Sequence, residues 1–161
     1  MGIDNTDYVG SFKENVTRLG EIFDKEEQAT QELAAIDDAI AELHEKATSE
    51  AATGLIVMLS EGDLSAYGPG SRFGFLHDQL GIEAIDQELD PEASHGQNVS
   101  YEYVVEQNPD YLFVIDRAAA IGDEPADNNE FENELIQNTQ AYKDGNIVYL
   151  DLCTGTYPAV D

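Results

Sequence analysis

Three short runs of mainly apolar residues set the strongest limit on how this chain can fold. They cover residues 54–59, 111–116 and 146–150, and each is continuous rather than alternating with polar residues. This pattern is typical of strands that are buried on both faces, as in parallel sheets covered by helices. Because helical patterns lie between the runs, the sequence predicts an α/β fold: a three-layer α/β/α sandwich with a mostly parallel sheet.

The first 50 residues have the periodicity of helices. Apolar residues recur there at spacings of three and four in two groups, which predicts two helices with a bend at Gly20. Residues 24–27 resemble a capping box and are expected to start the second helix. We expect both apolar stripes to be core. The stripes consist of Val9, Phe12, Val16, Leu19, Ile22 and Phe23, and of Leu33, Ile36, Ile40, Leu43 and Ala47.

Shorter patterns predict the remaining elements. Ser71 is a favourable N-cap and Gly81 a favourable stop, so a helix is expected between them. Residues 61–70 are expected to form a loop before this helix, and residues 82–85 a brief strand after it. Two further helices are predicted over residues 100–106 and 129–142.

The charge balance excludes several classes of function. The 161 residues include 34 acids and 7 bases, which gives a net charge of −27 and a pI near 4.1. Nucleic acids and anionic membrane surfaces are excluded as partners, because binding them requires clustered Lys and Arg. We interpret the acid excess as surface solvation in a high-salt habitat, where salt screens the repulsion. The alternative, a polyanionic calcium binder, lacks the required D-x-D-x-D-G loop.

The sequence also lacks the motifs of several other classes of protein. No apolar run approaches the ~20 residues of a membrane span, and the first four residues lack the features of a signal peptide. The one cysteine, Cys153, permits neither an internal disulfide nor a cysteine-built metal site. Catalytic motifs such as G-x-S-x-G, the P-loop and H-E-x-x-H are absent, so we expect no enzyme activity.

Ligands of parallel α/β sheets bind at the loops that follow the strands. Only three basic residues occur after residue 50: Arg72, Arg117 and Lys143. Arg117 directly follows a predicted strand, and Arg72 opens a predicted helix, where free N–H groups favour anions. Either arginine could instead pair with a carboxylate, but their placement in strand-end loops favours an anionic ligand. The expected strand-end loops are residues 60–70, 116–123 and 151–157.

The three histidines differ in their surroundings. His44 lies on a charged helix face and is expected to be solvated. His77 lies five residues after Arg72 in the same predicted helix, and we expect it to have a helix-packing role. His95 lies in a loop of small residues and is the one histidine in a plausible ligand position, although a lone loop histidine often has no special role.

A run of motifs resembles a known family. Residues 68–74 (GPGSRFG), followed by residues 77–81 (HDQLG), resemble the second-lobe signature of iron–siderophore-binding proteins of bacterial ABC importers. The similarity is closest to the branch that binds catecholate, petrobactin-like ferric complexes. It continues through residues 95–96, 108–117 and 148–151. Residues 8–26 resemble the long helix that joins the two lobes of that family.

The resemblance implies a set of site residues. Arg72 and Arg117, with the neighbouring Ser71, would bind the anionic ferric catecholate. His95 matches a histidine that coordinates iron when the siderophore leaves two positions open, and Tyr157 would be its partner ligand. No intrinsic cofactor is implied, since ferric iron arrives as part of the siderophore complex.

The resemblance also implies how the chain is organised. Residues 1–50 are interpreted as an interlobe helical segment and residues 51–161 as a C-terminal ligand-binding lobe, incomplete at its end. The first lobe, a secretion signal, a lipid-anchor cysteine and the terminal helix are not found in the sequence. The parent protein is expected outside the cytoplasm, in the periplasm or as a cell-surface lipoprotein, with an ABC importer permease as partner.

Two alternatives from other classes remain open at this point. The chain could be a scaffold module that self-associates through its helices and through the surface left by the missing lobe, forming a homo-oligomer. It could also be a flavodoxin-like hydrolase that uses Asp116 or Cys153.

Overall fold

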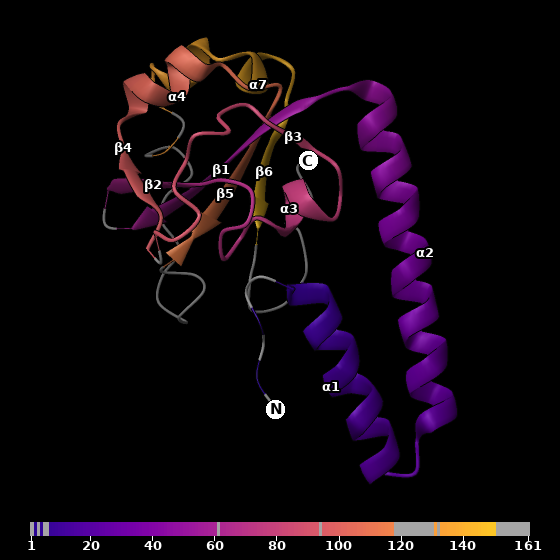
Figure 1. Cartoon of the computed structure of the whole chain (residues 1–161). Coiled ribbons are helices and arrows are strands. Elements are labelled where there is room, and N and C mark those ends of the chain that lie inside the picture. The colour runs from indigo at the N-terminus through magenta and orange to yellow at the C-terminus, as the bar shows by residue number, and fades with distance from the viewer. Residues whose placement is uncertain are drawn as a thin grey trace.

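The computed structural model describes residues 2, 4, 7–60, 62–93, 95–117, 131 and 133–150. A helical hairpin leads into an α/β lobe (Figure 1). The helices are α1 (Tyr8–Ile22), α2 (Glu26–Glu50), α3 (Phe75–Asp78), α4 (Tyr101–Gln107), the 3-10 helix η1 (Ile136–Asn138) and α7 (Gln140–Lys143). The strands are β1 (Thr53–Ser60), β2 (Asp63–Tyr67), β3 (Glu83–Ala84), β4 (Gln97–Val99), β5 (Tyr111–Asp116) and β6 (Ile147–Leu150).

The predicted strands form the centre of the sheet. The strand order is β4-β2-β1-β5-β6, and β3 pairs with the start of β1. Strands β1, β5 and β6 are neighbours and parallel, with Ile56 opposite Phe113 and Phe113 opposite Val148. The prediction of three parallel strands is confirmed, and so is the brief strand after residue 81. Strands β1 and β5 are largely buried as predicted, whereas β6, the last strand in the order, is only partly buried.

The outer strands β2 and β4 are antiparallel, and the prediction of a loop over residues 61–70 is wrong for β2. Strand β2 forms a hairpin with β1, in which Ser60 lies opposite Asp63. Leu64, Ala66 and Tyr67 are buried in β2, whereas Ser65 is only partly buried. In sequence this short alternating stretch is hard to distinguish from a loop, because its stability comes from pairing with β1.

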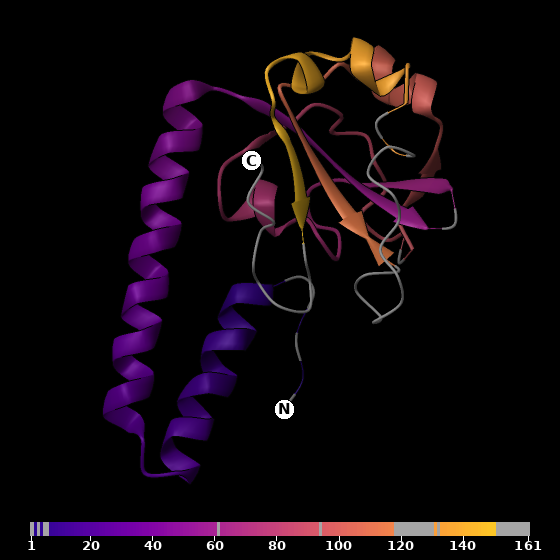
Figure 2. The same cartoon turned by 180° about the vertical axis from the view of Figure 1, so that it is seen from behind.

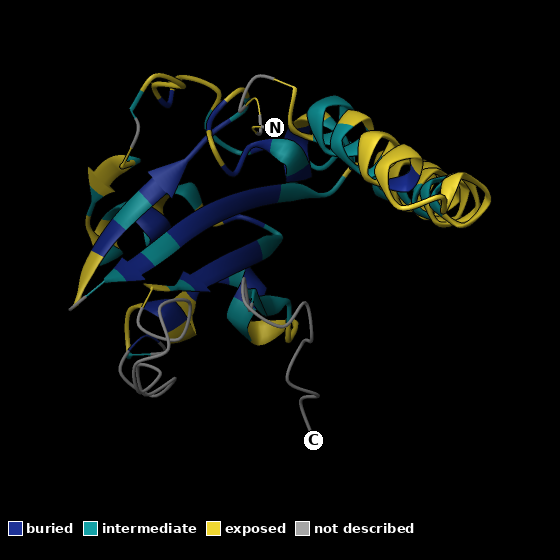
Figure 3. Ribbon diagram, turned by 90° about the horizontal axis from the view of Figure 1, so that it is seen from below, coloured by how far each residue is buried: buried dark blue, intermediate teal, exposed yellow. Residues whose placement is uncertain are grey.

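Two apolar clusters fill the two faces of the sheet, because alternate residues of each strand point to opposite sides. The first cluster lies under α4, η1 and α7, and the second lies under α3. The first cluster consists of Leu55, Val57, Leu59, Leu64, Ala66, Leu89, Val104, Leu112, Val114, Phe131, Ile136 and Ala141. The second cluster consists of Ile56, Tyr67, Phe73, Leu76, Phe113 and Ile115. The predicted three-layer sandwich is therefore confirmed (Figure 3).

Helices α1 and α2 form an antiparallel hairpin that extends beside the lobe (Figure 2). Gly20 lies within α1 and is buried, and a Cβ there would lie 2.9 Å from the Cβ of Ala29. Gly20 thus permits close approach of the helices, and its prediction as a bend is wrong. The turn lies at residues 23–25, with Asp24 at φ +52°, and Lys25 is the N-cap of α2 without a side-chain bond. The predicted capping box is therefore also wrong.

The hairpin leaves part of its apolar stripes exposed. Ile22 and Phe23 are each 66% exposed and Leu43 is 50% exposed. Helix α2 contains no buried residue. The expectation that both stripes are core is wrong for these positions. Ile22 and Phe23 lie at the turn between the helices, where the hairpin extends away from the lobe. Figure 3 shows this contrast between the exposed hairpin and the buried strands.

Two predicted helices are shorter in the structure. The helix expected over residues 71–81 is reduced to α3, whose N-cap is Gly74 rather than Ser71. Within the described part of the segment 129–142, η1 and α7 replace one continuous helix. Thr139 separates them, since its hydroxyl donates to the carbonyl of Ile136 at 2.7 Å and accepts from the amide of Tyr142 at 3.3 Å. Helix α4 is confirmed, with Ser100 as its N-cap.

Candidate ligand-binding site

Arg117 lies at the carboxyl edge of the sheet, directly after β5. Its Nη1 donates to the Oγ of Ser60, the last residue of β1, at 3.4 Å. Leu59 lies opposite Asp116 in the parallel register, so the next residues on both strands, Ser60 and Arg117, are neighbours. Because side chains alternate along a strand, both share a face with Ile115, a member of the second apolar cluster. The Arg117 side chain is exposed there.

The other arginine, Arg72, is carried by a tightly bonded turn at residues 68–74. The amide and the hydroxyl of Ser71 both donate to the carbonyl of Gly68, at 3.3 and 2.6 Å. The carboxylate of Asp78 accepts from the amide of Gly70 at 2.8 Å. Ser71 is buried, while Arg72 is exposed. The turn therefore uses Ser71 to hold its own backbone and presents Arg72 to solvent.

Aromatic rings support Arg72. Its guanidinium carbon lies 5.0 Å from the centroid of the Phe73 ring, within the range of a cation–π contact. The Phe73 ring meets the Tyr67 ring edge to face, with centroids 4.8 Å apart. Burial raises the pKa of Tyr67, and the nearby positive charge of Arg72 partly opposes this rise. Since Phe73 and Tyr67 belong to the second apolar cluster, both arginines stand on the same face of the sheet.

His95 lies in an exposed turn that packs against the same tyrosine. The next residue, Gly96, has φ +75°, and a Cβ there would lie 2.7 Å from Cζ of Tyr67. The structure thus brings the Arg72 turn and the His95 turn onto one aromatic side chain. Tyr157 lies outside the described residues. Within the described part of the chain, no cluster of three or more His, Cys, Asp or Glu residues could hold a metal ion.

The other two histidines differ in burial. His77 is buried, with Nδ1 2.9 Å from the carbonyl oxygen of Ile82, and burial lowers its pKa. Its predicted packing role is confirmed. His44 is exposed on α2, as expected for a solvated residue. Its Nδ1 lies 3.1 Å from the carbonyl oxygen of Gln79, a contact that links α2 to the segment after α3.

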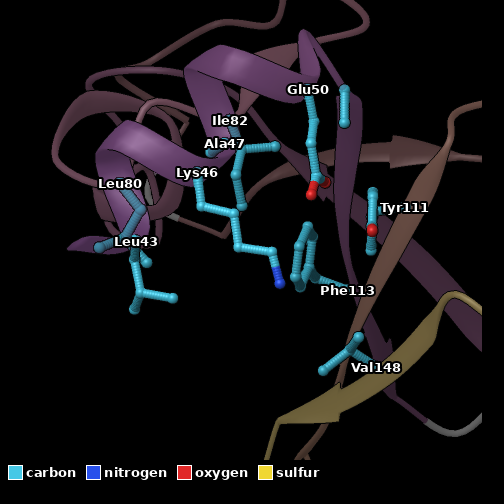
Figure 4. Close-up of a pocket in the computed structure, with 10 residues that line it drawn as sticks. Leu43, Lys46, Ala47, Glu50, Leu80, Ile82, Tyr111, Phe113 and Val148 are labelled. Atoms are coloured by element: carbon cyan, nitrogen blue, oxygen red, sulfur yellow. The ribbon is translucent and has the colours of Figure 1, made fainter. Parts of the chain in front are cut away.

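An apolar pocket of about 190 Å³ lies on the same face of the sheet, away from the arginines (Figure 4). It is enclosed by the C-terminal half of α2, the segment after α3 and strands β5 and β6. Tyr111 and Ala52 place it toward the amino ends of the strands, whereas Arg117 follows a carboxyl end. The pocket is therefore separate from the candidate site.

Two residues of the candidate site are not evident from sequence reasoning. Ser60 and Tyr67 have ordinary sequence surroundings, and their roles follow from the strand pairing and from the ring contacts. The aromatic residues flanking the Gly-Pro-Gly motif were the one available signal for Tyr67.

None of the described helices has the length and apolar character that crossing a bilayer requires.

The fold is that of solute-binding proteins, and the chain belongs to the periplasmic binding protein family. The family model matches residues 1–152. Its members are substrate-binding proteins and not enzymes, which confirms the expected lack of enzyme activity and removes the hydrolase alternative. The structural neighbours are class III binding proteins.

Individual relatives agree with this assignment. The chain is 44% identical over 154 residues to the petrobactin-binding protein YclQ of Bacillus subtilis, covering 96% of this chain and 48% of that protein. It is 34% identical over 145 residues to the ferric-anguibactin-binding protein FatB of Vibrio anguillarum, covering 89% and 45%. The chain therefore spans about half the length of these relatives.

Solved structures of siderophore-binding proteins have a similar fold over about half of their length. The crystal structure of YclQ matches with a TM-score of 0.86 at 43% identity, covering 95% of this chain and 53% of that one. The catecholate-siderophore-binding protein VctP of Vibrio cholerae matches with a TM-score of 0.88 at 28% identity, covering 96% and 56%. The resemblance to siderophore-binding proteins is thus confirmed in both sequence and fold.

Proposed function

We propose that this chain is the C-terminal lobe of the substrate-binding component of an ABC importer for ferric catecholate siderophores. In this proposal residues 1–50 are the interlobe helical segment and residues 51–161 form the ligand-binding lobe. The names of its relatives, which bind petrobactin, ferric anguibactin and catecholate siderophores, support this ligand class. The observation that carries the proposal is the placement of Arg72 and Arg117 on one face of the sheet.

Electrostatics makes these two side chains important for the proposed ligand. A ferric tris-catecholate carries about three negative charges, so a protein with a net charge of −27 repels it at long range. Exposed guanidinium groups next to the binding face offset this repulsion at short range. Each also offers a rigid fork of donors to catecholate oxygens. Ser71 contributes by holding the turn that carries Arg72.

Direct iron coordination is the second part of the proposal. A tetradentate bis-catecholate leaves two of the six positions on ferric iron open, and imidazole and phenolate are suitable ligands for them. His95, in its exposed turn, would supply the imidazole, and Tyr157 the phenolate. The iron is cargo that arrives with the siderophore, so no resident cofactor is required.

The partner and the location follow from the family. Because periplasmic binding proteins act outside the cytoplasm, we propose that the parent protein is extracytoplasmic, in the periplasm or anchored to the cell surface as a lipoprotein. Its protein partner would then be the permease of the importer.

A scaffold role is the second candidate, because the hairpin exposes Ile22, Phe23 and Leu43. A module of this kind would self-associate through these residues without binding a siderophore. Measuring the mass of the purified chain by light scattering separates this candidate from a monomeric binding lobe.

Colour provides the direct test of siderophore binding, because ferric catecholates absorb strongly in the visible. The chain is mixed with the ferric complex of a hexadentate tris-catecholate and passed over a desalting column. We expect colour to elute with the protein, and the double variant Arg72→Ala/Arg117→Ala to lose it. Wild-type protein that elutes colourless would refute ligand binding by this chain, and equal colour in the double variant would refute the arginine site.

A further inference from the structure

We propose that Tyr67 is a positioning residue that holds the Arg72 turn and the His95 turn in a fixed relation, so that both can act on one ligand. This inference rests on the proposed function and extends it to a residue that does not contact the ligand. Tyr67 is only 2% exposed, which leaves its ring no surface for a siderophore.

The ring of Tyr67 is fixed by the sheet. Tyr67 is the last residue of β2 and lies opposite Ile56 in β1, within the hairpin register. Its hydroxyl donates to Sδ of Met58 at 3.9 Å, a weak contact on the same face of β1. The backbone that carries the Tyr67 ring is therefore part of a paired strand rather than a loop.

On one side the ring supports Arg72 through Phe73. The Tyr67 and Phe73 rings meet at 86°, the edge-to-face geometry that aromatic pairs prefer. Phe73 in turn carries the guanidinium of Arg72 over its ring. Any shift of Tyr67 changes the surface on which Phe73 rests, and with it the position of Arg72.

On the other side the ring supports the turn that carries His95. The α carbon of Gly96 approaches the ring so closely that a Cβ would come within 2.9 Å of two ring carbons, Cζ and Cε2. The turn is closed by the amide of Gly96, which donates to the carbonyl of Ala93 at 2.8 Å. Glycine at this position lets a backbone segment rest directly on the ring, one residue from His95.

Arg72 and His95 are 23 residues apart along the chain, and Tyr67 is the side chain on which both of their turns pack. A positioning role therefore predicts energetic coupling between Tyr67 and Arg72. A residue that contributes only to core stability would act on folding and would leave this coupling at zero.

The test compares Tyr67→Leu, which removes the ring, with Tyr67→Phe, which keeps it. Val104→Ala, in the first apolar cluster on the opposite face, is the matched control for lost core packing. The affinity for a hexadentate ferric tris-catecholate is measured for each variant in the wild-type and in the Arg72→Ala background. We expect Tyr67→Leu to weaken binding about tenfold in the wild-type background and less than about twofold in the Arg72→Ala background. Tyr67→Phe and Val104→Ala should each change it less than about twofold in both.

A second measurement does not depend on the siderophore. Backbone NMR relaxation of the free protein reports order at the amides of residues 72 and 96. Tyr67→Leu should lower the order at both, with no change at Arg117, whose contact is to Ser60. If Tyr67→Leu does not fold, Gly96→Ala replaces it, since the added methyl group presses on the ring from the His95 side.

The outcomes separate the inference from the proposed function. Wild-type protein that binds no ferric catecholate refutes the proposed function, while the relaxation data still decide whether Tyr67 orders both turns. Equal losses from Tyr67→Leu in both backgrounds, or unchanged order at residues 72 and 96, would overturn the positioning role. A Val104→Ala loss as large as that of Tyr67→Leu would overturn it as well.

Discussion

Arg117 donates a hydrogen bond from Nη1 to the Oγ of Ser60 at 3.4 Å, and this contact joins the carboxyl ends of β5 and β1. The parallel register explains it, because Leu59 pairs with Asp116 one residue earlier on each strand. An exposed guanidinium is thereby held at the edge of the sheet where ligands of α/β folds bind.

The arginines are expected to carry the binding free energy of an anionic ligand. Arg117→Ala should weaken ferric-catecholate binding by about 2 kcal/mol, roughly 30-fold, as expected for the loss of a charge-assisted contact. Arg72→Ala should have a similar effect. Lys143→Ala is the matched control, because its Nζ donates to the carbonyl of Asn138 next to α7 and not at the candidate site. Equal losses in a titration of all three variants would mean that only net charge is sensed.

His95 should matter for one class of siderophore only. A hexadentate ligand fills the coordination sphere of iron, so His95→Ala should leave its affinity unchanged. A tetradentate ligand leaves positions open, and coordination by His95 should impose one handedness at iron and give a visible circular dichroism band. We expect His95→Ala to abolish that band and Tyr157→Phe to reduce it less. A wild-type complex without visible dichroism would refute direct coordination.

Salt should stabilise the fold. The acids far outnumber the bases, and in the described part of the chain the ion pairs are Lys13–Asp37 and Arg18–Glu14, both in the helical hairpin. Screening therefore removes more repulsion than attraction. The melting temperature should rise as potassium chloride increases from dilute to molar concentration. A melting temperature that stays constant or falls would contradict the interpretation of the acids as a high-salt adaptation.

The buried His77 should make stability depend on pH. Burial lowers its pKa in the folded state, so below an unfolded-state pKa of about 6.5 the unfolded chain binds the proton more readily. The free energy of unfolding should thus be highest above this pH and fall as the pH drops from about 6.5 toward the lower folded pKa. Urea unfolding of wild type and His77→Gln between about pH 7 and 5.5 measures this contribution. An equal slope in wild type and His77→Gln would contradict this contribution of His77.

Local sequence patterns determined the centre of the lobe. The apolar runs at residues 55–59, 111–115 and 147–150 lie in β1, β5 and β6, and such continuous runs are typical of parallel strands that helices cover. Helix α4 was equally predictable, because Ser100 supplies its own cap within three residues. Arg117 could be placed at a strand end for the same reason, because it directly follows one of the predicted strands.

Tertiary contacts decided the rest, because they join residues that no local pattern relates. Strand β2 exists through its pairing with β1, and Gly20 is required by its approach to Ala29 rather than by a bend. The exposure of Ile22 depends on what lies beside the hairpin, which helical periodicity does not specify. Likewise, the support of Arg72 and His95 by Tyr67 arises only when β2 brings one buried ring between two turns that are distant in sequence.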